Sequence, residues 1–324
     1  MNIIKKNYKF IIILILILLL FNIKFPYYID APGGITDISN KIEIEGYDSK
    51  GSFNLAYVKE YRASIPTLLI SLFNKDYKII KQEEILLDSE DNSSYETRDK
   101  ILMNEGISNA IYVAYTKANK KIDIIDNNVS VIHILKDANT NLIPGDSIIS
   151  INNNVIKYKT DITNILDNLN TNKKINIKVI NNNKEYNRYA YIDKDKKIGI
   201  LIANICEYKT DPKVEIKTDK KESGSSGGLI TALSIYNSLV SKDITKGKTI
   251  VGTGTIDLNG NVGSIGGVAY KLKSAVKAKA DIFIVPNDEN YDEAIKIKKE
   301  NNYDIDIIGV STFDDALDYL NSID

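Results

Sequence analysis

An apolar segment near the N-terminus constrains the chain more than any other feature. The run from Phe10 to Phe21 contains no polar residue. As a helix it is about 18 Å long, which is short of the roughly 30 Å hydrocarbon core of a bilayer. Continuing the helix through Ile23, Phe25 and Tyr27-Tyr28-Ile29 makes a membrane span feasible. We therefore expect residues 1–30 to form a cytoplasmic tip and a signal anchor.

The residues around this run predict its orientation. Lys5, Lys6 and Lys9 precede it, and basic residues favour the cytoplasmic side. The predicted localisation is the cell membrane, with a single pass and the bulk of the chain outside the cell. A cleaved signal peptide stays open as the alternative, although no small-x-small cleavage site precedes Ala31-Pro32.

Two scarce residue types exclude several classes of enzyme. The chain has one histidine, His133, and one cysteine, Cys206. A zinc peptidase with two histidine ligands is excluded, and a histidine-based triad would have to use His133. His133 lies in an alternating, strand-like run, where a structural role is expected, and Cys206 is expected to be a small core residue. No metal or cofactor site is predicted, and a net charge of -1 gives no indication of nucleic-acid binding.

The middle of the chain suggests a separate small domain over residues 120–196, after an N-terminal α+β region at 31–119. A strand at 129–135 leads to Leu142-Ile-Pro-Gly-Asp-Ser-Ile-Ile-Ser-Ile-Asn, and a helix at 160–169 and a strand at 174–180 follow. This pattern resembles the PDZ family, which implies a groove that binds an extended peptide as an added strand. No clear Gly-Leu-Gly-Phe loop precedes Val129, so recognition of a free carboxyl terminus is not expected. Another small α+β domain is the alternative.

A turn-rich segment before a helix is the first candidate for chemistry. Gly224-Ser225-Ser226-Gly227-Gly228 immediately precedes an apolar, helix-like run from Leu229 to Val240. Backbone N–H groups at a helix start are unpaired and can stabilise an oxyanion, and glycine lets a substrate approach the main chain. By itself, however, a Ser/Gly-rich loop there is also typical of a simple N-cap.

The downstream sequence supplies further elements in a definite order. A strand that begins at Lys248 leads through Thr253 to a hairpin turn at Asn259-Gly260 and a returning strand. Gly266-Gly267-Val268-Ala269-Tyr270-Lys271 then opens a helix. A buried strand at 281–287, a helix, a strand at 304–310 and a helix capped by Thr312 end the chain.

Together these elements resemble the Lon-type peptidase domain over roughly 197–324. The loop at 224–228 is similar to that family's Gly-Pro-Ser-Ala-Gly nucleophile motif, and Gly266 to Lys271 are similar to its Gly-Gly-hydrophobic-x-x-Lys element. The resemblance implies Ser226 as nucleophile, Lys271 as general base and Thr253 beside the lysine. Gly224, Ser225 and Gly227 are supporting residues. The predicted class is α+β, with a transmembrane helix, a PDZ-like domain and a Lon-type proteolytic α/β domain.

The resemblance has two departures in the loop. Ser225 and Gly227 replace the proline and the alanine, which leaves a looser loop with a second hydroxyl, and Ser223 stands where some relatives have an acidic residue. Ser223 and Ser225 are therefore the competing nucleophiles. A lysine acts as a base only when it is neutral, so burial must lower the pKa of Lys271 from its usual value.

The complete arrangement is similar to the YlbL/SepM-like surface peptidases of Gram-positive bacteria. It implies a membrane-anchored serine endopeptidase that cuts secreted or membrane-associated peptides or proteins. Gly247-Lys248-Thr249 imitates a phosphate-binding loop but lacks the required upstream glycine, so action without ATP is expected. A catalytically inactive anchored scaffold and a homo-oligomeric platform stay open as alternatives.

Overall fold

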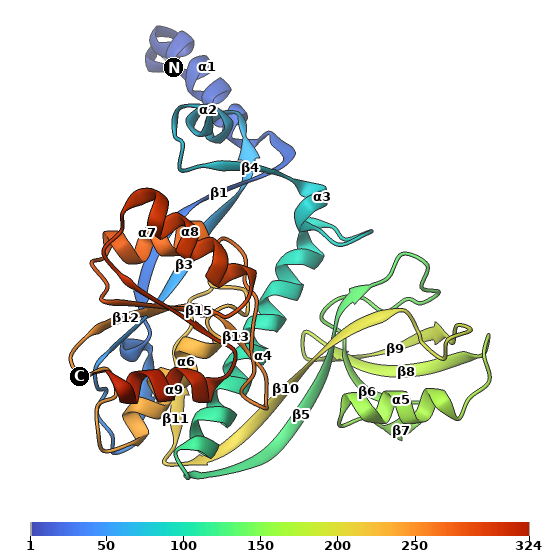
Figure 1. The fold of residues 1–324 in the computed structure, drawn as a ribbon. Coiled ribbons are helices and arrows are strands. Elements are labelled where there is room, and N and C mark those ends of the chain that lie inside the picture. The colour runs from blue at the N-terminus through green and yellow to red at the C-terminus, as the bar shows by residue number, and fades with distance from the viewer. Residues whose placement is uncertain (1, 324) are drawn as a thin grey trace.

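A six-stranded sheet forms the centre of the molecule. A computed structural model describes residues 2–323, with side chains described from residue 7. In spatial order the strands are β16 (Asp306–Val310), β15 (Ile282–Pro286), β12 (Thr249–Gly252), β3 (Ser52–Ser64), β1 (Lys24–Asp37) and β4 (Lys78–Lys81). The four strands from β16 to β3 are parallel, and β1 and β4 are antiparallel to their neighbours. The sheet therefore combines strands from both ends of the sequence (Figure 1).

Helices cover both faces of this sheet and make it a three-layer α/β/α structure. The helices are α4 (Asn92–Lys117), α6 (Gly228–Leu239) and α9 (Phe313–Ser322) on one face, and α7 (Val268–Lys277) and α8 (Glu289–Asn301) on the other. Successive residues of β12 and β15 alternate between the two cores: Ile250 and Ile282 pack with α6, whereas Val251 and Phe283 pack with α7. Burial on both faces explains why β15 is a continuous apolar run.

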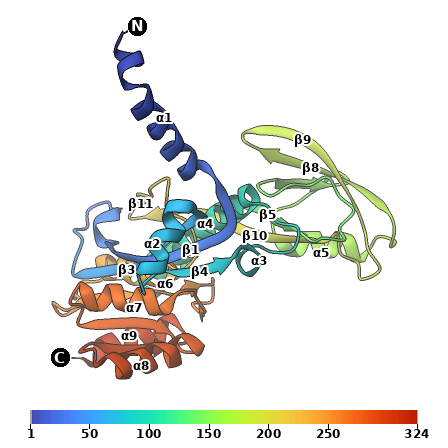
Figure 2. The ribbon, with the colours of Figure 1, turned by 90° about the horizontal axis from the view of Figure 1, so that it is seen from above.

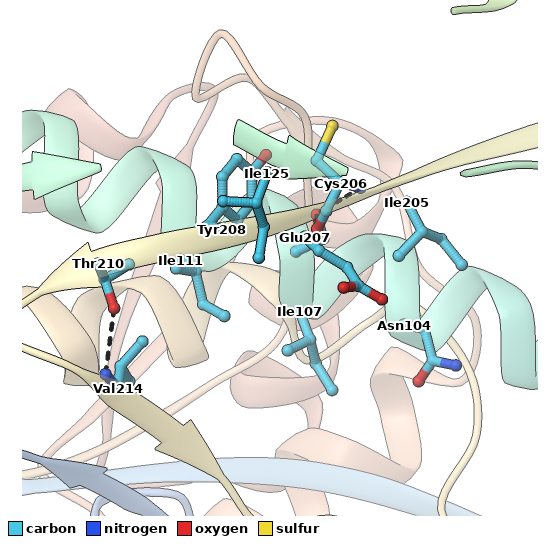
Figure 3. A pocket seen from close by; sticks show the side chains of 11 residues that line it. Asn104, Ile107, Ile111, Ile125, Ile205, Cys206, Glu207, Tyr208, Thr210 and Val214 are labelled. Atoms are coloured by element: carbon cyan, nitrogen blue, oxygen red, sulfur yellow. Dashed lines mark hydrogen bonds between the residues drawn. The ribbon is translucent and has the colours of Figure 1, made fainter. Parts of the chain in front are cut away.

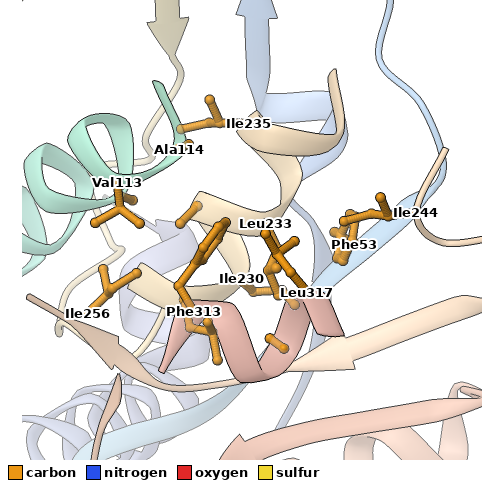
Figure 4. Packing of buried hydrophobic residues seen from close by; sticks show 14 of the residues in the cluster. Phe53, Val113, Ala114, Ile230, Leu233, Ile235, Ile244, Ile256, Phe313 and Leu317 are labelled. Carbon is orange, nitrogen blue, oxygen red and sulfur yellow. The ribbon is translucent and has the colours of Figure 1, made fainter. Parts of the chain in front are cut away.

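The core under α6 is the larger of the two. Figure 4 shows Phe53 of β3, Leu233 of α6 and Phe313 of α9 converging there. Ala110 and Ala114 of α4 are fully buried in it. Thr312 caps α9 by accepting a hydrogen bond from the Asp315 N–H, which confirms the predicted cap.

A second sheet forms a separate lobe with its own core. Its strands are β10 (Ile200–Asp211), β5 (Lys121–Ile134), β6 (Ser147–Ile151), β8 (Lys174–Asn181) and β9 (Lys184–Tyr191), with β7 (Asn154–Val155) beside β6 and α5 (Lys159–Asp167) against the sheet. Asn152 and Asn153 have positive φ and form the hairpin turn between β6 and β7. His133 lies buried in β5, as expected of a structural histidine. The predicted division of the chain at residues 120 and 197 stays a prediction.

The long strands β5 and β10 connect this lobe to the first. They pair from Ile134↔Ile200 to Lys121↔Asp211 and form a ribbon that passes along α4 (Figures 1 and 2). The remaining elements are short. They are η1 (Ser39–Lys41), the paired strands β2 (Ile42–Ile44) and β11 (Val214–Ile216), and the paired strands β13 (Thr255–Ile256) and β14 (Val262–Gly263).

The N-terminal helix is shorter than the sequence suggests. α1 (Asn2–Asn22) ends before β1 begins. In the sequence, α2 (Ile65–Phe73) precedes β4 and α3 (Gln82–Ile85) follows it. Continuing the helix through Tyr27-Tyr28-Ile29 is wrong, because Tyr28 and Ile29 are buried and pair with β3. Among the residues that the structure describes, no helix is both long and apolar enough to cross a membrane. The side chains of Lys5 and Lys6, from which the orientation of the N-terminus is predicted, lie outside the side chains that the structure describes.

Candidate functional site

Ser226 lies in the turn that leads into α6. The helix begins at Gly228, with Gly227 at its N-cap position, and Ser226 is partly buried just before it. In the described part of the chain, the structure shows no hydrogen bond from the N–H groups of Ser226 and Gly227, whereas the Gly228 N–H donates to the Ser225 carbonyl at 3.2 Å. Two N–H groups at the positive end of a helix are thus left for an external acceptor.

Contacts from distant parts of the chain hold this loop. Gly224 has φ +86° and donates its N–H to the Asp99 carbonyl of α4 at 3.1 Å. At Gly106, also in α4, an added Cβ would lie 3.4 Å from the Ser225 carbonyl oxygen. At Gly227, an added Cβ would lie 3.0 Å from Leu55 of β3, so a bulkier residue there would crowd β3. The loop therefore rests between α4 and β3.

Lys271 is buried one turn into α7. Only 4% of its surface is exposed, and burial lowers the pKa of its ammonium group from 10.5 to about 8. The lowered pKa agrees with the direction that the sequence predicts. Gly267, the N-cap of this helix, has φ +67°, and a Cβ there would lie 2.7 Å from Val58, which explains the glycine at this position.

Thr253 connects the lysine with the serine loop. The Lys271 Nζ atom donates to Thr253 Oγ1 at 3.0 Å, and Thr253 Oγ1 donates to the Ser226 carbonyl oxygen at 3.2 Å. The Gly254 N–H donates to the same carbonyl at 2.8 Å. Thr253 is fully buried. The structure thus brings Ser226, Thr253 and Lys271 together, but the polar contact described for Lys271 is with Thr253 and not with the Ser226 hydroxyl.

The other residues predicted for the site lie in the Ser226 loop or just before it. Gly224, Ser225 and Gly227 share the loop, and Ser223 precedes it in an exposed position. Asp99, Gly106 and Leu55 also support the loop. The residue types of Asp99 and Leu55 do not indicate this role in the sequence. Gly106, a glycine inside a helix, is the one signal that predicts a close approach there.

A cavity elsewhere is separate from this centre. It has a volume of about 380 Å³, lies between α4 and the β10 strand, and is lined in part by Ile107, Cys206 and Tyr208 (Figure 3). Cys206 is 7% exposed, and its thiol donates to Asn127 Oδ1 at 3.4 Å, in keeping with a structural cysteine. None of the three residues of the candidate centre lines this cavity.

Comparisons with known proteins match the segment of the chain that contains Ser226, Thr253 and Lys271. Residues 216–321 match the Lon protease (S16) C-terminal proteolytic domain. The chain is 35% identical over 97 residues to a Lon protease of Campylobacter jejuni, a match that covers 30% of this chain and 12% of that protein. It is 37% identical over 95 residues to Lon protease 2 of Bacillus subtilis, which covers 29% of this chain and 16% of that protein.

The match is confined to one part of each protein. The chain spans less than a fifth of the length of these curated relatives, so their remaining regions have no counterpart in the comparison. Ser226, Thr253 and Lys271 all lie inside the matched residues. The segment from residue 216 to residue 321, with its mixed α/β fold, is therefore the part of this chain that matches the Lon protease proteolytic domain, a domain of serine peptidases.

Proposed function

We propose that this chain is a serine endopeptidase in which Ser226 is the nucleophile and Lys271 the general base. The observation that carries the proposal is the buried Lys271, whose pKa of about 8 leaves a useful fraction of neutral amine near neutral pH. The match of residues 216–321 to a Lon proteolytic domain supports a peptidase independently of this geometry.

Thr253 orients the amine for this task. Its hydroxyl proton is directed at the Ser226 carbonyl, so a lone pair of Thr253 Oγ1 is left to accept a hydrogen bond from the Lys271 N–H. The lysine therefore uses an N–H bond toward Thr253 and keeps its own lone pair for another donor. In the proposed reactive arrangement, a rotation of the Ser226 side chain brings its O–H to that lone pair.

The reaction then follows in two halves. Neutral Lys271 removes the proton of the Ser226 hydroxyl while Oγ bonds to the substrate carbonyl carbon, and the free N–H groups of Ser226 and Gly227 bind the resulting oxyanion. The ammonium returns the proton to the leaving amine nitrogen as the peptide C–N bond breaks, which leaves an acyl-enzyme. Water, deprotonated by the regenerated amine, attacks the ester and releases the acid and the free serine.

Replacement of the two residues tests this assignment. Ser226→Ala and Lys271→Ala are each expected to abolish cleavage of an unstructured protein by the purified chain, because either one removes the nucleophile or its base. Ser225→Ala and Ser223→Ala are matched controls that are expected to keep activity. Undiminished cleavage by Ser226→Ala would refute the assignment.

We also propose that the substrate is a secreted or membrane-associated peptide or protein, cut at the outer surface of the cell membrane without ATP. The basic and then apolar N-terminus supports this location. Digestion of intact cells with added protease is expected to degrade both lobes, and ATP is expected to leave the cleavage rate unchanged. Protection of both lobes in intact cells would contradict the location.

The second lobe, which contains residues 120–196, is proposed to be PDZ-like and to present the substrate. The α5 helix and the antiparallel sheet beside it provide the components of a groove for an extended peptide. Binding of substrate to full-length Ser226→Ala protein, measured without turnover, tests this role. Unchanged affinity after charge substitutions along α5 would argue against it.

One observation favours a second function, an inactive anchored scaffold. Lys271 is hydrogen-bonded to Thr253 and not to the Ser226 side chain. Labelling with a serine-reactive fluorophosphonate decides between the two functions, because only an activated serine reacts readily. Absence of labelling at Ser226 would support the scaffold, and light scattering of the same sample would test a homo-oligomeric platform.

A further inference from the structure

The helix α2 exposes large apolar side chains at its C-terminal end. Leu69, Ile70, Leu72 and Phe73 are 53%, 53%, 70% and 88% exposed. Such neighbouring residues form a contiguous patch, whereas isolated exposed apolar residues are ordinary on a protein surface. Water alone is therefore an unfavourable environment for this end of α2.

The patch is not part of either packed core of the two lobes. None of its four side chains belongs to a buried cluster among the described residues or packs against one. The helix is nevertheless well formed, because Ser64 and Thr67 make a capping box at its start and Ser71 donates to the Leu68 carbonyl. A stable helix thus presents the apolar patch outward.

The helix that carries the patch contacts the apolar N-terminal helix. α1 and α2 contact each other and lie together at one end of the molecule (Figure 1). Between Phe10 and Phe21 the side chains of α1 are exposed around most of the helix, from Phe10 at 67% to Leu20 at 39%. A helix that is apolar all round suits a hydrocarbon environment better than the one-sided groove of a protein partner.

Two lysines lie in the short segment that follows α2. α2 itself contains no charged residue, and Lys75 and Lys78 follow it in exposed positions. The nearby Asp76 is paired with Lys273 of α7, so its negative charge is compensated. Exposed lysines beside an apolar patch are the pattern that attracts an anionic lipid surface.

We propose that α2 inserts Leu69, Ile70, Leu72 and Phe73 into the surface of a lipid bilayer, beside α1, with Lys75 and Lys78 at the level of anionic headgroups. The α2 helix is then a second, peripheral membrane contact that orients the two lobes relative to the bilayer. The proposal concerns orientation alone and holds whether or not Ser226 is catalytic.

A probe attached to cysteine can test this contact in the full chain. The only native cysteine, Cys206, is buried, so an environment-sensitive fluorophore will label Phe73→Cys selectively. Val155→Cys is the matched control, because Val155 is 64% exposed in the lobe farthest from α1 in Figure 1. Both proteins are incorporated into vesicles of phosphatidylcholine with phosphatidylglycerol.

Insertion predicts opposite behaviour at the two positions. The probe at residue 73 is expected to shift its emission to the blue, to be quenched by spin-labelled lipid and to be shielded several-fold from aqueous iodide. The probe at residue 155 is expected to show none of these changes. Equal access of iodide to both probes in vesicles would overturn the proposal. So would shielding of residue 73 before lipid is added, because a second copy or another segment would then cover the patch.

A quantitative variant separates the contribution of α2 from that of α1. Replacing the four apolar residues with serine leaves α1 intact and is expected to weaken partitioning onto these vesicles at least about tenfold, given the area that would be withdrawn from lipid. Lys75→Ser with Lys78→Ser is expected to weaken partitioning only when phosphatidylglycerol is present. Unchanged partitioning of the fourfold serine variant would overturn the proposal.

Discussion

Lys271 at the start of α7 is 4% exposed, whereas Phe73 at the end of α2 is 88% exposed. Lys271 is thus an ionisable side chain in the protein interior, and Phe73 is an aromatic side chain exposed to solvent. Both arrangements oppose the usual partition of side chains on folding. The two regions are also connected, because Asp76 beyond α2 pairs with Lys273 of α7.

The comparison teaches that stability alone explains neither region. Lowering the pKa of Lys271 from 10.5 to about 8 corresponds to about 3 kcal/mol that the folded protein loses at neutral pH. The four apolar side chains of the α2 patch stay exposed, so they do not contribute the free energy of burial that the buried apolar residues of the chain contribute. The proposed role of Lys271 as a base requires a neutral amine, and the proposed lipid contact requires an exposed apolar patch.

The largest expected effect is on catalysis at the buried lysine. Lys271→Met should lower the kcat/KM of peptide cleavage by at least about a thousandfold, since it removes the proposed base. The same variant should unfold with a free energy about 2 to 3 kcal/mol higher, because methionine fills the site without a charge. Lys273→Met, at the partly exposed neighbour, should change stability by less than about 0.5 kcal/mol and keep activity. Loss of stability in Lys271→Met would break the comparison.

The pH dependence of stability gives the next largest effect. Because the pKa of Lys271 is lower in the folded state than in the unfolded state, the unfolded chain binds more protons between pH 8 and 10.5. The penalty is fully present below pH 8 and is relieved by up to about 3 kcal/mol as the pH rises through this window. The difference between wild type and Lys271→Met, measured by denaturant unfolding at each pH, isolates this group. Cleavage should rise about tenfold per pH unit below 8 and level off above it.

The contact between Lys271 and Thr253 should have an intermediate effect. Thr253→Val removes the acceptor at 3.0 Å and keeps the shape of the side chain, so the amine loses its orientation. We expect kcat/KM to fall about ten- to a hundredfold with little change in KM, since positioning affects the transition state more than binding. Thr253→Ser keeps the hydroxyl and should restore most of the activity. An equal loss in both variants would show that packing, and not the hydrogen bond, matters at this position.

Substitutions at Gly266 and Gly267 test whether the backbone conformation at the start of α7 requires glycine. Gly267→Ala places a Cβ against Val58 at φ +67° and should destabilise the fold by about 1 to 3 kcal/mol. Gly266→Ala meets no atom within 4 Å and should be nearly neutral. Thermal unfolding of the two variants measures the difference. Equal stability would mean that α7 can begin in another conformation, and the buried position of Lys271 would then be less rigidly set.

The sequence predicted the local elements of the site better than their surroundings. Hydrophobic periodicity places α6 and β15 within a residue or two of their observed ends, and the Thr312 cap is confirmed. Those signals are local and depend on neighbouring residues. The supports of the Ser226 loop are not local, because Asp99 and Leu55 reach it from strands and helices more than a hundred residues away. No spacing in the sequence could reveal that contact.

The beginning of the chain shows the opposite error. The apolar residues after Asn22 were predicted to lengthen the helix, yet Tyr28 and Ile29 belong to β1. An apolar run is equally suited to a buried strand, and pairing with β3 and β4 decides between them. The start of α4 instead depends on a local polar cap, because the Asp91 side chain accepts a hydrogen bond from the Ser94 N–H.

The smallest expected effect tests the exposed side of the comparison. Replacing Leu69, Ile70, Leu72 and Phe73 with serine should change the unfolding free energy of the detergent-solubilised chain by no more than about 0.5 kcal/mol, because little packing is lost. Leu233→Ala in the core under α6 is the matched contrast and should cost about 2 to 5 kcal/mol. If the serine variant instead loses more than about 1 kcal/mol, the patch packs against the protein in solution. Its apolar side chains would then be explained by folding, as those of the core are, and only the buried lysine would need a functional reason.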